Sequence, residues 1–412
     1  MKIMTLSAMA LMMATAAVAQ EGCGIEGPAS VRILSNDFPA LRAVSERAAG
    51  CATGTVTVTS NPTTEHQNIQ VPALTANPPE YTVAVVANDS IPSLLNEGLI
   101  RPLDDLVAQY GQDLQPNQLI RIDGKVMAIA FMANAQHLAV RRDVLEQAGI
   151  ATPPATYEEV LAAAEAIRAA GLMETPLAAN NKVGWDLAEE FVNMYLGYGG
   201  DFFQPGSATL AIDPAKAVPA LEMMKALSAY MPADNLTLDS TASSALYTQG
   251  RIAMVNMWGS RTGGFLDPAQ ANPEVAASTV LTRAPTVGGG TIPASTIWWD
   301  GFTIAKNASD ADAAASFRAM VHGMQAGSDP ANADLAAWLV AGYQPTPAVI
   351  GVIETAQAGA KPYPMQPWMG LLHTALGTEL ADFMQGSESA EQALADVAAA
   401  YEAAARAEGF LQ

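Results

Sequence analysis

Basic side chains are scarce in this sequence. Its 412 residues include 20 lysines and arginines against 41 aspartates and glutamates, which gives a formal net charge of −21. Proteins that bind nucleic acid neutralise phosphates with lysine and arginine, and anionic membrane surfaces attract the same side chains. The charge balance therefore argues against both kinds of partner. We ascribe the acidity to solubility and attach no ligand preference to it.

Metal-binding and cofactor motifs are also missing. The four histidines (His66, His137, His322 and His373) are scattered, without the spacing of a metal site. The glycine run 288–290 lacks the lysine and the strand–helix context of a phosphate-binding loop. No Gly-x-Ser-x-Gly nucleophile motif occurs. We therefore expect no metal, no cofactor and no catalytic residues.

Long apolar runs are missing except at the start of the chain. Residues 6–18 are apolar, follow Lys2 and end in the small-x-small triplet 17–19. This stretch is too short to cross a hydrocarbon core of roughly 30 Å as a helix, and its pattern is that of a cleavable signal peptide. We predict a signal peptide over residues 1–19, a mature chain that begins near Gln20, and a soluble protein in the periplasm.

Only two cysteines are present, Cys23 and Cys51. An even number of cysteines in an exported protein favours a disulfide. Zinc is the alternative, but two cysteines without a nearby histidine pair fall short of the four ligands of a structural zinc site. Cys23 and Cys51 each lie shortly before a predicted strand, so we expect the bridge at the amino ends of neighbouring strands.

Strand and helix patterns alternate at the start of the mature chain. β-Strands are predicted over residues 31–34, 55–59 and 81–87, and helices over 38–49 and 91–97. The last of these strands is a near-continuous apolar run, as expected of a strand buried on both faces. This alternation predicts a doubly wound α/β lobe.

Three polar loops follow the three predicted strands, at residues 35–37, 61–66 and 88–90. Ligands of open α/β sheets bind at the carboxyl ends of the strands. Helix capping is the alternative role of such residues, because Asn, Asp and Ser are also the commonest caps. The candidate binding residues in or next to these loops are Asp37, Glu65, Asn88 and Asp89.

Six short segments carry a resemblance to a known family. They are 94–106 (LLNEGLIRPLDDL), 123–126 (DGKV), 143–159 (DVLEQAGIATPPATYEE), 247–254 (YTQGRIAM), 301–309 (GFTIAKNAS) and 344–347 (QPTP). In this order, and over nearly the whole mature chain, they resemble the motifs of the family 1 extracellular solute-binding proteins. This is the sugar-capturing group that includes maltose-binding protein.

The resemblance implies a periplasmic-binding-protein type II fold, with two doubly wound α/β lobes joined by a hinge. It places residues 20–132 and 285–328 in the N-terminal lobe, and 133–284 and 329–412 in the C-terminal lobe. A ligand then binds between the lobes and favours the closed form, which requires that it bind this form more tightly.

Tryptophans are the strongest candidates for sugar contacts, because indole faces pack well against the C–H faces of sugar rings. Of the six, Trp258 follows the segment 247–254 and there resembles the sugar-stacking tryptophan of the family. Trp298 and Trp299 are consecutive in a predicted strand, so one of them is expected to face the ligand and the other to be buried. Core packing is the alternative for each tryptophan.

Polar side chains complete the candidate site. Carboxylates and amides form the hydrogen bonds that sugar hydroxyls need, and an arginine either joins them or pairs with an acid. The remaining candidates are Asn134, Gln136, Trp185, Asp186, Arg261, Asp300 and Tyr343.

These features predict a non-enzymatic, monomeric binding component of an ABC importer that presents a neutral mono- or oligosaccharide to a membrane permease. One alternative is a binder of an anionic or phosphorylated solute, which requires several basic groups in the cleft. The other is a periplasmic enzyme acting on glycans, which requires two carboxyl groups facing each other across it.

Overall fold

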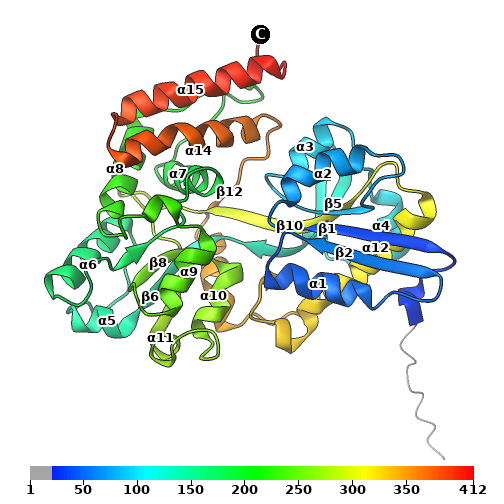
Figure 1. Cartoon of the computed structure of the whole chain (residues 1–412), viewed down its shortest axis with the longest axis horizontal. Coiled ribbons are helices and arrows are strands. Elements are labelled where there is room, and N and C mark those ends of the chain that lie inside the picture. The colour runs from blue at the N-terminus through cyan, green and yellow to red at the C-terminus, as the bar shows by residue number, and fades with distance from the viewer. Residues whose placement is uncertain (1–20) are drawn as a thin grey trace, which may run out of the picture.

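The computed structural model describes residues 21–412 and shows two α/β lobes side by side (Figure 1). The predicted signal peptide, residues 1–19, lies outside the described residues. Within residues 21–412, no helix has both the length and the apolar character that a bilayer crossing requires.

The first lobe is built on a sheet of eight strands. They are β1 (Ala29–Ser35), β2 (Val56–Pro62), β3 (Val83–Ala87), β4 (Leu119–Ile122), β5 (Lys125–Asn134), β10 (Thr296–Ile304), β11 (Ala337–Trp338) and β12 (Lys361–Pro362). β1 pairs in parallel with both β2 and β3, and the antiparallel strand β10 lies between β3 and β5. The predicted first three strands correspond to β1, β2 and β3, which confirms the doubly wound start of the chain.

Helices cover both faces of this sheet (Figure 1). They are α1 (Pro39–Ala49), α2 (His66–Thr75), α3 (Ile91–Asn96), α4 (Asp104–Tyr110) and α12 (Asp310–Met324). In α1, the buried residues Leu41, Val44 and Ala48 recur at helical spacing. With this stripe buried, α1 packs against α12 and β2, and the amphipathic pattern accounts for a helix here.

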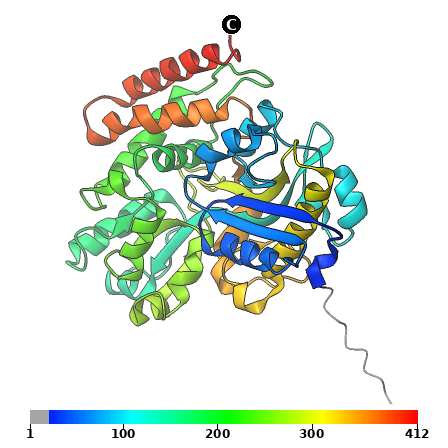
Figure 2. The same ribbon diagram turned by 45° about the vertical axis from the view of Figure 1, so that its right-hand side comes forward.

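The second lobe has a smaller sheet, in the strand order β7-β8-β6-β9. Its strands are β6 (Gln136–Arg141), β7 (Leu177–Ala178), β8 (Met254–Trp258) and β9 (Thr279–Thr282). Its helices are α5 (Arg142–Gln147), α6 (Tyr157–Ala169), α7 (Trp185–Gly197), α8 (Pro214–Ser228), α9 (Ser240–Thr248), α10 (Gly259–Leu266), α11 (Pro273–Ser278), α13 (Ile350–Gln357), α14 (Met369–Gln385) and α15 (Ala390–Ala407). α14 and α15 form an outer layer of this lobe, and α14 packs on α7 (Figure 2).

The two sheets are joined where β5 passes into β6, with the fully buried Ala135 between them. The core on each side differs from the expected lobe boundaries in two places. Val287 and Ala294, expected in the first lobe, pack in the second core. Trp338 and Val340, expected in the second lobe, pack in the first core. The reason for the second difference is β11, which pairs with the edge of β5 and takes its flanking residues with it.

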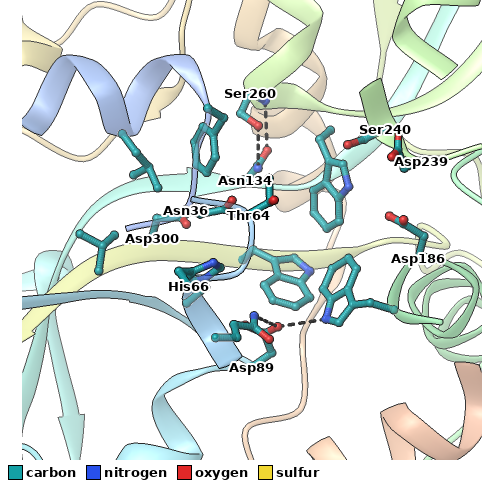
Figure 3. A pocket seen from close by; sticks show the side chains of 18 of the residues that line it. Asn36, Thr64, His66, Asp89, Asn134, Asp186, Asp239, Ser240, Ser260 and Asp300 are labelled. Carbon is teal, nitrogen blue, oxygen red and sulfur yellow. Dashed lines mark hydrogen bonds between the residues drawn. The ribbon is translucent and has the colours of Figure 1, made fainter. Parts of the chain in front are cut away.

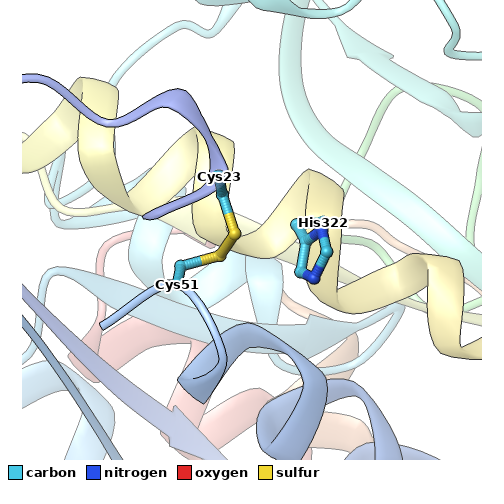
Figure 4. A group of neighbouring side chains, drawn as sticks. All are labelled: Cys23, Cys51 and His322. Carbon is cyan, nitrogen blue, oxygen red and sulfur yellow. A yellow bond between two sulfur atoms is a disulfide. The ribbon is translucent and has the colours of Figure 1, made fainter. Parts of the chain in front are cut away.

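The predicted disulfide between Cys23 and Cys51 is confirmed. It lies near the amino ends of the paired strands β1 and β2, away from the carboxyl ends at which a ligand is expected. His322 on α12 is close to both sulfur atoms (Figure 4). Because the two sulfur atoms are bonded to each other, this group offers no thiolate to a metal ion.

We expect loss of the disulfide to lower the free energy of unfolding by about 3–4 kcal/mol, because the bond closes a loop over a sequence separation of 28 residues. Urea unfolding of the oxidised and the reduced protein measures this difference. A Cys23→Ala/Cys51→Ala variant is the control, since reductant must leave its unfolding curve unchanged. Equal stability of the oxidised and reduced forms would contradict the prediction.

Candidate functional site

A cavity of about 630 Å³ lies where the two lobes meet. The first lobe contributes the loops after β1, β2 and β3, together with part of β10. The second lobe contributes the starts of α7 and α9 and the junction between β8 and α10. The predicted position of the site, at the carboxyl ends of the first three strands, therefore coincides with this cavity.

Three indole rings from three elements cluster in the cavity wall. Trp185 begins α7, Trp258 ends β8 and Trp298 lies on β10. The ring centroid of Trp185 lies 6.2 Å from that of Trp258 and 5.6 Å from that of Trp298. The ring centroids of Trp258 and Trp298 are 5.7 Å apart. Trp185 is 37 % exposed, whereas Trp258 and Trp298 are 9 % and 5 % exposed. Trp185 is thus the open face of the cluster, and the other two also belong to the second core.

The backbone before α7 fixes the position of Trp185. Gly184 has a φ angle of 107°, which is unfavourable for any residue with a side chain. Its amide donates a hydrogen bond to the carbonyl of Gly377 on α14 at 3.0 Å. A Cβ atom on Gly377 would lie 2.3 Å from the carbonyl oxygen of Gly184. Close contact with α14 therefore depends on glycine at both positions.

His373, also on α14, contacts both the backbone carbonyl and the ring of Trp185. Its Nε2 atom lies 3.0 Å from the carbonyl oxygen of Trp185, and its Nδ1 atom lies 2.8 Å from the hydroxyl of Tyr363. A carbonyl only accepts, so Nε2 carries the proton and Nδ1 accepts from Tyr363. Burial lowers the pKa of His373 to about 4, which keeps this ring neutral. Tyr363 in turn packs against Trp298, with ring centroids 4.3 Å apart.

Asp89 connects the two lobes across the cavity. Its Oδ2 atom accepts hydrogen bonds from Nε2 of Gln67 at 2.8 Å and from Nε1 of Trp185 at 3.1 Å (Figure 3). Asp89 and Gln67 belong to the first lobe and Trp185 to the second. This hydrogen bond therefore joins the two lobes at the cavity wall.

The first-lobe half of the cavity is acidic. Burial, together with the nearby charge of Asp89, raises the pKa of Asp300 to about 7, and burial also raises the pKa of Asp89. The Asp300 carboxyl group forms no hydrogen bond with any residue that the structure describes. His66 is buried in the same wall, and burial lowers its pKa to about 4. It is therefore neutral and adds no positive charge.

The second-lobe half combines both signs of charge. Lys182 lies 3.7 Å from a carboxylate oxygen of Asp239. Burial, and then the charge of Asp239, raises the pKa of Asp186 to about 7. Burial lowers the pKa of Arg261, whose guanidinium is attracted by Asp239 and Asp186. Two acids and two bases thus face each other on this side.

Most of the residues predicted from the sequence are brought together here. The structure places nine of them in the wall of this one cavity: Glu65, Asp89, Asn134, Trp185, Asp186, Trp258, Arg261, Trp298 and Asp300. Asn134 has a second role, because its side chain donates to Oγ of Ser260 and accepts from the Ser260 amide at the start of α10. It thus ties the end of β5 to the second lobe.

Three of the other five have their side chains engaged outside the cavity, two through polar contacts and one through core packing. Asp37 forms an ion pair with Arg42 of α1. The hydroxyl of Tyr343 bonds to the carbonyls of Ala333 and Ala336. Trp299 packs against the first core, so Trp298 is the member of the pair that faces the ligand side.

The last two are buried polar residues. The Oδ1 atom of Asn88 accepts from the amide of Trp299 at 2.9 Å. The Oε1 atom of Gln136 accepts from the amide of Asn256 on β8. Each of these bonds serves the packing of strands, so neither side chain is free for a ligand.

Several cavity residues were not singled out from the sequence. In the first lobe they are Asn36, Phe38, Thr64, His66, Gln67 and Asn68, and in the second lobe Lys182, Asp239, Ser240, Thr241 and Ser260. The polar loops after β1 and β2 were recognised, and these contain Asn36, Thr64 and His66. Asp239 is the N-cap of α9. Aspartate is common at this position in any helix, so the sequence alone does not indicate a binding role.

The comparison with known proteins agrees with this geometry. The family profile described as bacterial extracellular solute-binding protein matches residues 52–322. The chain belongs to this family. None of the curated protein sequences matches it. Its sequence identity to the solved structures described next is 16–18 %, so the resemblance to them is one of fold.

Three solved structures illustrate the shared fold. Maltose-bound MalE3 from T. maritima has a TM-score of 0.77 at 16 % identity, and the match covers 91 % of this chain and 99 % of that one. An ABC transporter solute-binding protein from Agrobacterium vitis S4 with bound D-mannitol has a TM-score of 0.75 at 18 % identity, covering 92 % and 99 %. A chitin oligosaccharide binding protein has a TM-score of 0.73 at 17 % identity, covering 91 % and 98 %.

The raised pKa values predict how the stability of this solute-binding protein depends on pH. Asp186 and Asp300 have a pKa of about 7 when folded, against an ordinary value of 3.8. Between about pH 4 and about pH 7 the folded protein therefore keeps protons at these two sites that the unfolded chain releases. The stabilisation that these protons provide is complete below about pH 4 and is lost as the pH rises through about 7. We expect the melting temperature of the ligand-free protein to fall between about pH 5 and about pH 8.

Substitution separates this contribution from others. Asp300→Asn keeps the shape of the side chain and removes one titrating group, so it should make the fall smaller. Asp113→Asn, at an exposed acid outside the cavity, serves as the control. A melting temperature that rises with pH, or an equal fall in both variants, would count against the assignment.

The contact between Gly184 and Gly377 predicts a second effect. Gly377→Ala should push α14 away from the start of α7, cost about 1–3 kcal/mol of stability and disturb the tryptophan cluster. Near-ultraviolet circular dichroism and thermal unfolding measure the two effects. Gly370→Ala is the matched control on the same helix, because no atom lies within 4 Å of its Cβ position. Identical behaviour of the two variants would refute the role of this contact.

Proposed function

We propose that this protein is the ligand-binding component of an ABC importer and that it holds a mono- or oligosaccharide between its two lobes. The observation that carries the proposal is the wall of three indole rings, surrounded by carboxylate and amide groups, at the junction of the lobes. Indole faces match the C–H faces of sugar rings, and carboxylates form short, charge-assisted bonds with hydroxyl groups. The names of the similar structures, which report maltose, D-mannitol and a chitin oligosaccharide, support the same class of ligand.

The mechanism is closure of the lobes around the ligand. Trp185 and Asp186 belong to one lobe and Asp89 and Asp300 to the other, so a ligand that contacts both sets binds most tightly when the lobes are closed. Such a difference in affinity is what shifts the population toward the closed form. The closed protein, a monomer in the periplasm, then delivers the ligand to the permease in the inner membrane.

The alternative of a phosphorylated or anionic solute has less support. Only Lys182 and Arg261 contribute basic groups to the cavity wall, and Lys182 is already close to Asp239. Proteins of this family take part in transport, which argues against the third alternative, a glycan-acting enzyme. Incubation with the bound sugar should return it unchanged, and a cleaved product would favour the enzyme.

The tryptophan cluster provides the test of the proposal. Trp185→Ala should lower sugar affinity by about 2–4 kcal/mol and cost less stability than Trp258→Ala, because this ring is the exposed member of the cluster. Trp258→Ala should lower affinity and also cost about 3–5 kcal/mol of stability, because this ring is part of the core. Isothermal titration and thermal unfolding on the same samples separate the two outcomes.

The ligand for this test comes from a thermal-shift screen of sugars and polyols. A ligand at about 100 times its dissociation constant adds about 2.7 kcal/mol to the stability, which is readily measured. If Trp185→Ala binds the selected sugar as tightly as the original protein does, the indole wall is not the binding surface. The Trp368→Ala variant is the control, since Trp368 lies outside the cavity.

A further inference from the structure

We propose that the sugar or polyol selected by this cavity carries a protonated amine, and that the ammonium group binds in the first-lobe half, between Asp89 and Asp300. This inference rests on the proposed function and makes its ligand more specific. The neutral sugar expected from the sequence is replaced by an amino sugar or amino polyol.

The distribution of charge around the cavity is the first argument. Two acids and two bases balance on the second-lobe side, as described above. The first-lobe side contributes Glu65, Asp89 and Asp300 to the wall and no lysine or arginine among the described residues. Its remaining titratable side chain, His66, is neutral because of its burial. The acidic groups of the cavity wall that have no basic neighbour are therefore confined to one half.

The hydrogen-bonding state of Asp300 is the second argument. Its backbone lies on β10, which pairs with β3 on one side and with β5 on the other. Its carboxyl group lines the cavity and makes no hydrogen bond to a described residue. When the lobes close, a neutral ligand leaves two partly desolvated carboxylates close together. A cation between them removes this repulsion, and attraction between opposite charges is strong where water is excluded.

The third argument is the match between donors and acceptors. A primary ammonium group has three donors and no acceptor. The first-lobe wall offers the oxygens of Asp89 and Asp300, and the buried ring of His66, whose Nδ1 atom has no hydrogen-bond partner among the described residues. Figure 3 shows Asp89, His66 and Asp300 on the side opposite Asp186 and Asp239.

The tryptophans favour a cation at the same place. Trp298 and Asp300 are two residues apart on β10, so their side chains point to the same face of the strand. The indole Nε1 of Trp185 donates a hydrogen bond to Asp89. The faces of indole rings attract cations in addition to packing on sugar rings. An ammonium group beside the two carboxylates would thus lie close to the indole rings, and the same indole rings would pack against the sugar ring that carries the amine.

Matched sugars test the inference directly. The probes are glucosamine, N-acetylglucosamine and glucose, the corresponding disaccharides chitobiose, diacetylchitobiose and cellobiose, and glucamine against sorbitol. Within each set, the members share the same sugar or polyol framework and differ in whether one type of position carries an amine, an acetamide or a hydroxyl group. Isothermal titration at neutral pH should show the amine binding at least about tenfold more tightly than its acetylated and hydroxyl counterparts in at least one set.

Variants locate the preference in the first-lobe half. Asp300→Asn should reduce the ratio of amine to neutral affinity to near one, because it removes the charge and keeps the shape. Asp113→Asn removes an equal charge outside the cavity and should leave the ratio unchanged. A preference that survives in Asp300→Asn would overturn the assignment of the amine to this position.

The outcomes separate this inference from the proposed function. If a neutral sugar from these sets or from the wider screen binds as tightly as every amine, the inference is wrong and the sugar-binding function stands. If neither amine nor neutral sugars bind, both fail. If an amine binds preferentially and Trp185→Ala abolishes binding, both hold.

Discussion

The direct passage of β5 into β6 is the constraint on which the site depends. One fully buried residue, Ala135, separates the strand that ends in the first sheet from the strand that begins the second. Ala135 packs with Val349 and Val352 in a small cluster between the two cores. Because the crossing is so short, the strand ends of the two lobes must face each other. Every group in the cavity wall takes its position from that arrangement.

Close packing around the crossing keeps it narrow. A Cβ atom at Gly351 would lie 2.2 Å from Nδ1 of His137 on β6, and one at Gly259 would lie 2.1 Å from Val352. Gly351 lets α13 pack directly on β6, and Gly259 lets the start of α10 pack directly on α13. At the same junction, Asn134 fixes α10 through two hydrogen bonds to Ser260. The side of the cavity near the crossing is therefore closely packed, and away from the crossing the lobes are joined by the hydrogen bonds from Trp185 to Asp89 and from Asn96 to the Pro367 carbonyl.

Much of the fold was predictable because it rests on local patterns. β-Branched and apolar runs predicted β1, β2 and β3, and Thr156 with Glu159 forms the capping box that its spacing indicates at the start of α6. Candidate residues at strand ends were also found, because strand ends converge in an α/β sheet. The boundaries between the lobes are harder to predict. β11 is only two residues long, and such a strand leaves no periodic signal in the sequence.

The candidate residues that do not line the cavity are held elsewhere for a physical reason. Asn88 and Gln136 have the side chains that a sugar site needs, but the same amide groups also satisfy backbone and side-chain partners in the interior. A sequence gives the chemical type of a side chain and does not give its partner. Lys182 and Asp239 show the converse, because they line the cavity although the sequence did not single them out. Each lies in a loop or at a helix cap, where charged side chains are usually exposed to solvent.

The charge of the cavity shows most clearly why the structure was needed. The net charge of −21 describes the whole surface and carries no ligand preference. Its placement does, because the second-lobe acids face Arg261 and Lys182 while Asp300 faces the cavity without a basic neighbour. Burial, and then the charge of Asp89, disfavour the ionised form of an acid in that position and raise its pKa. Replacing it with asparagine should stabilise the empty protein near neutral pH, so the cost of keeping an aspartate there is best explained by a ligand that uses its charge.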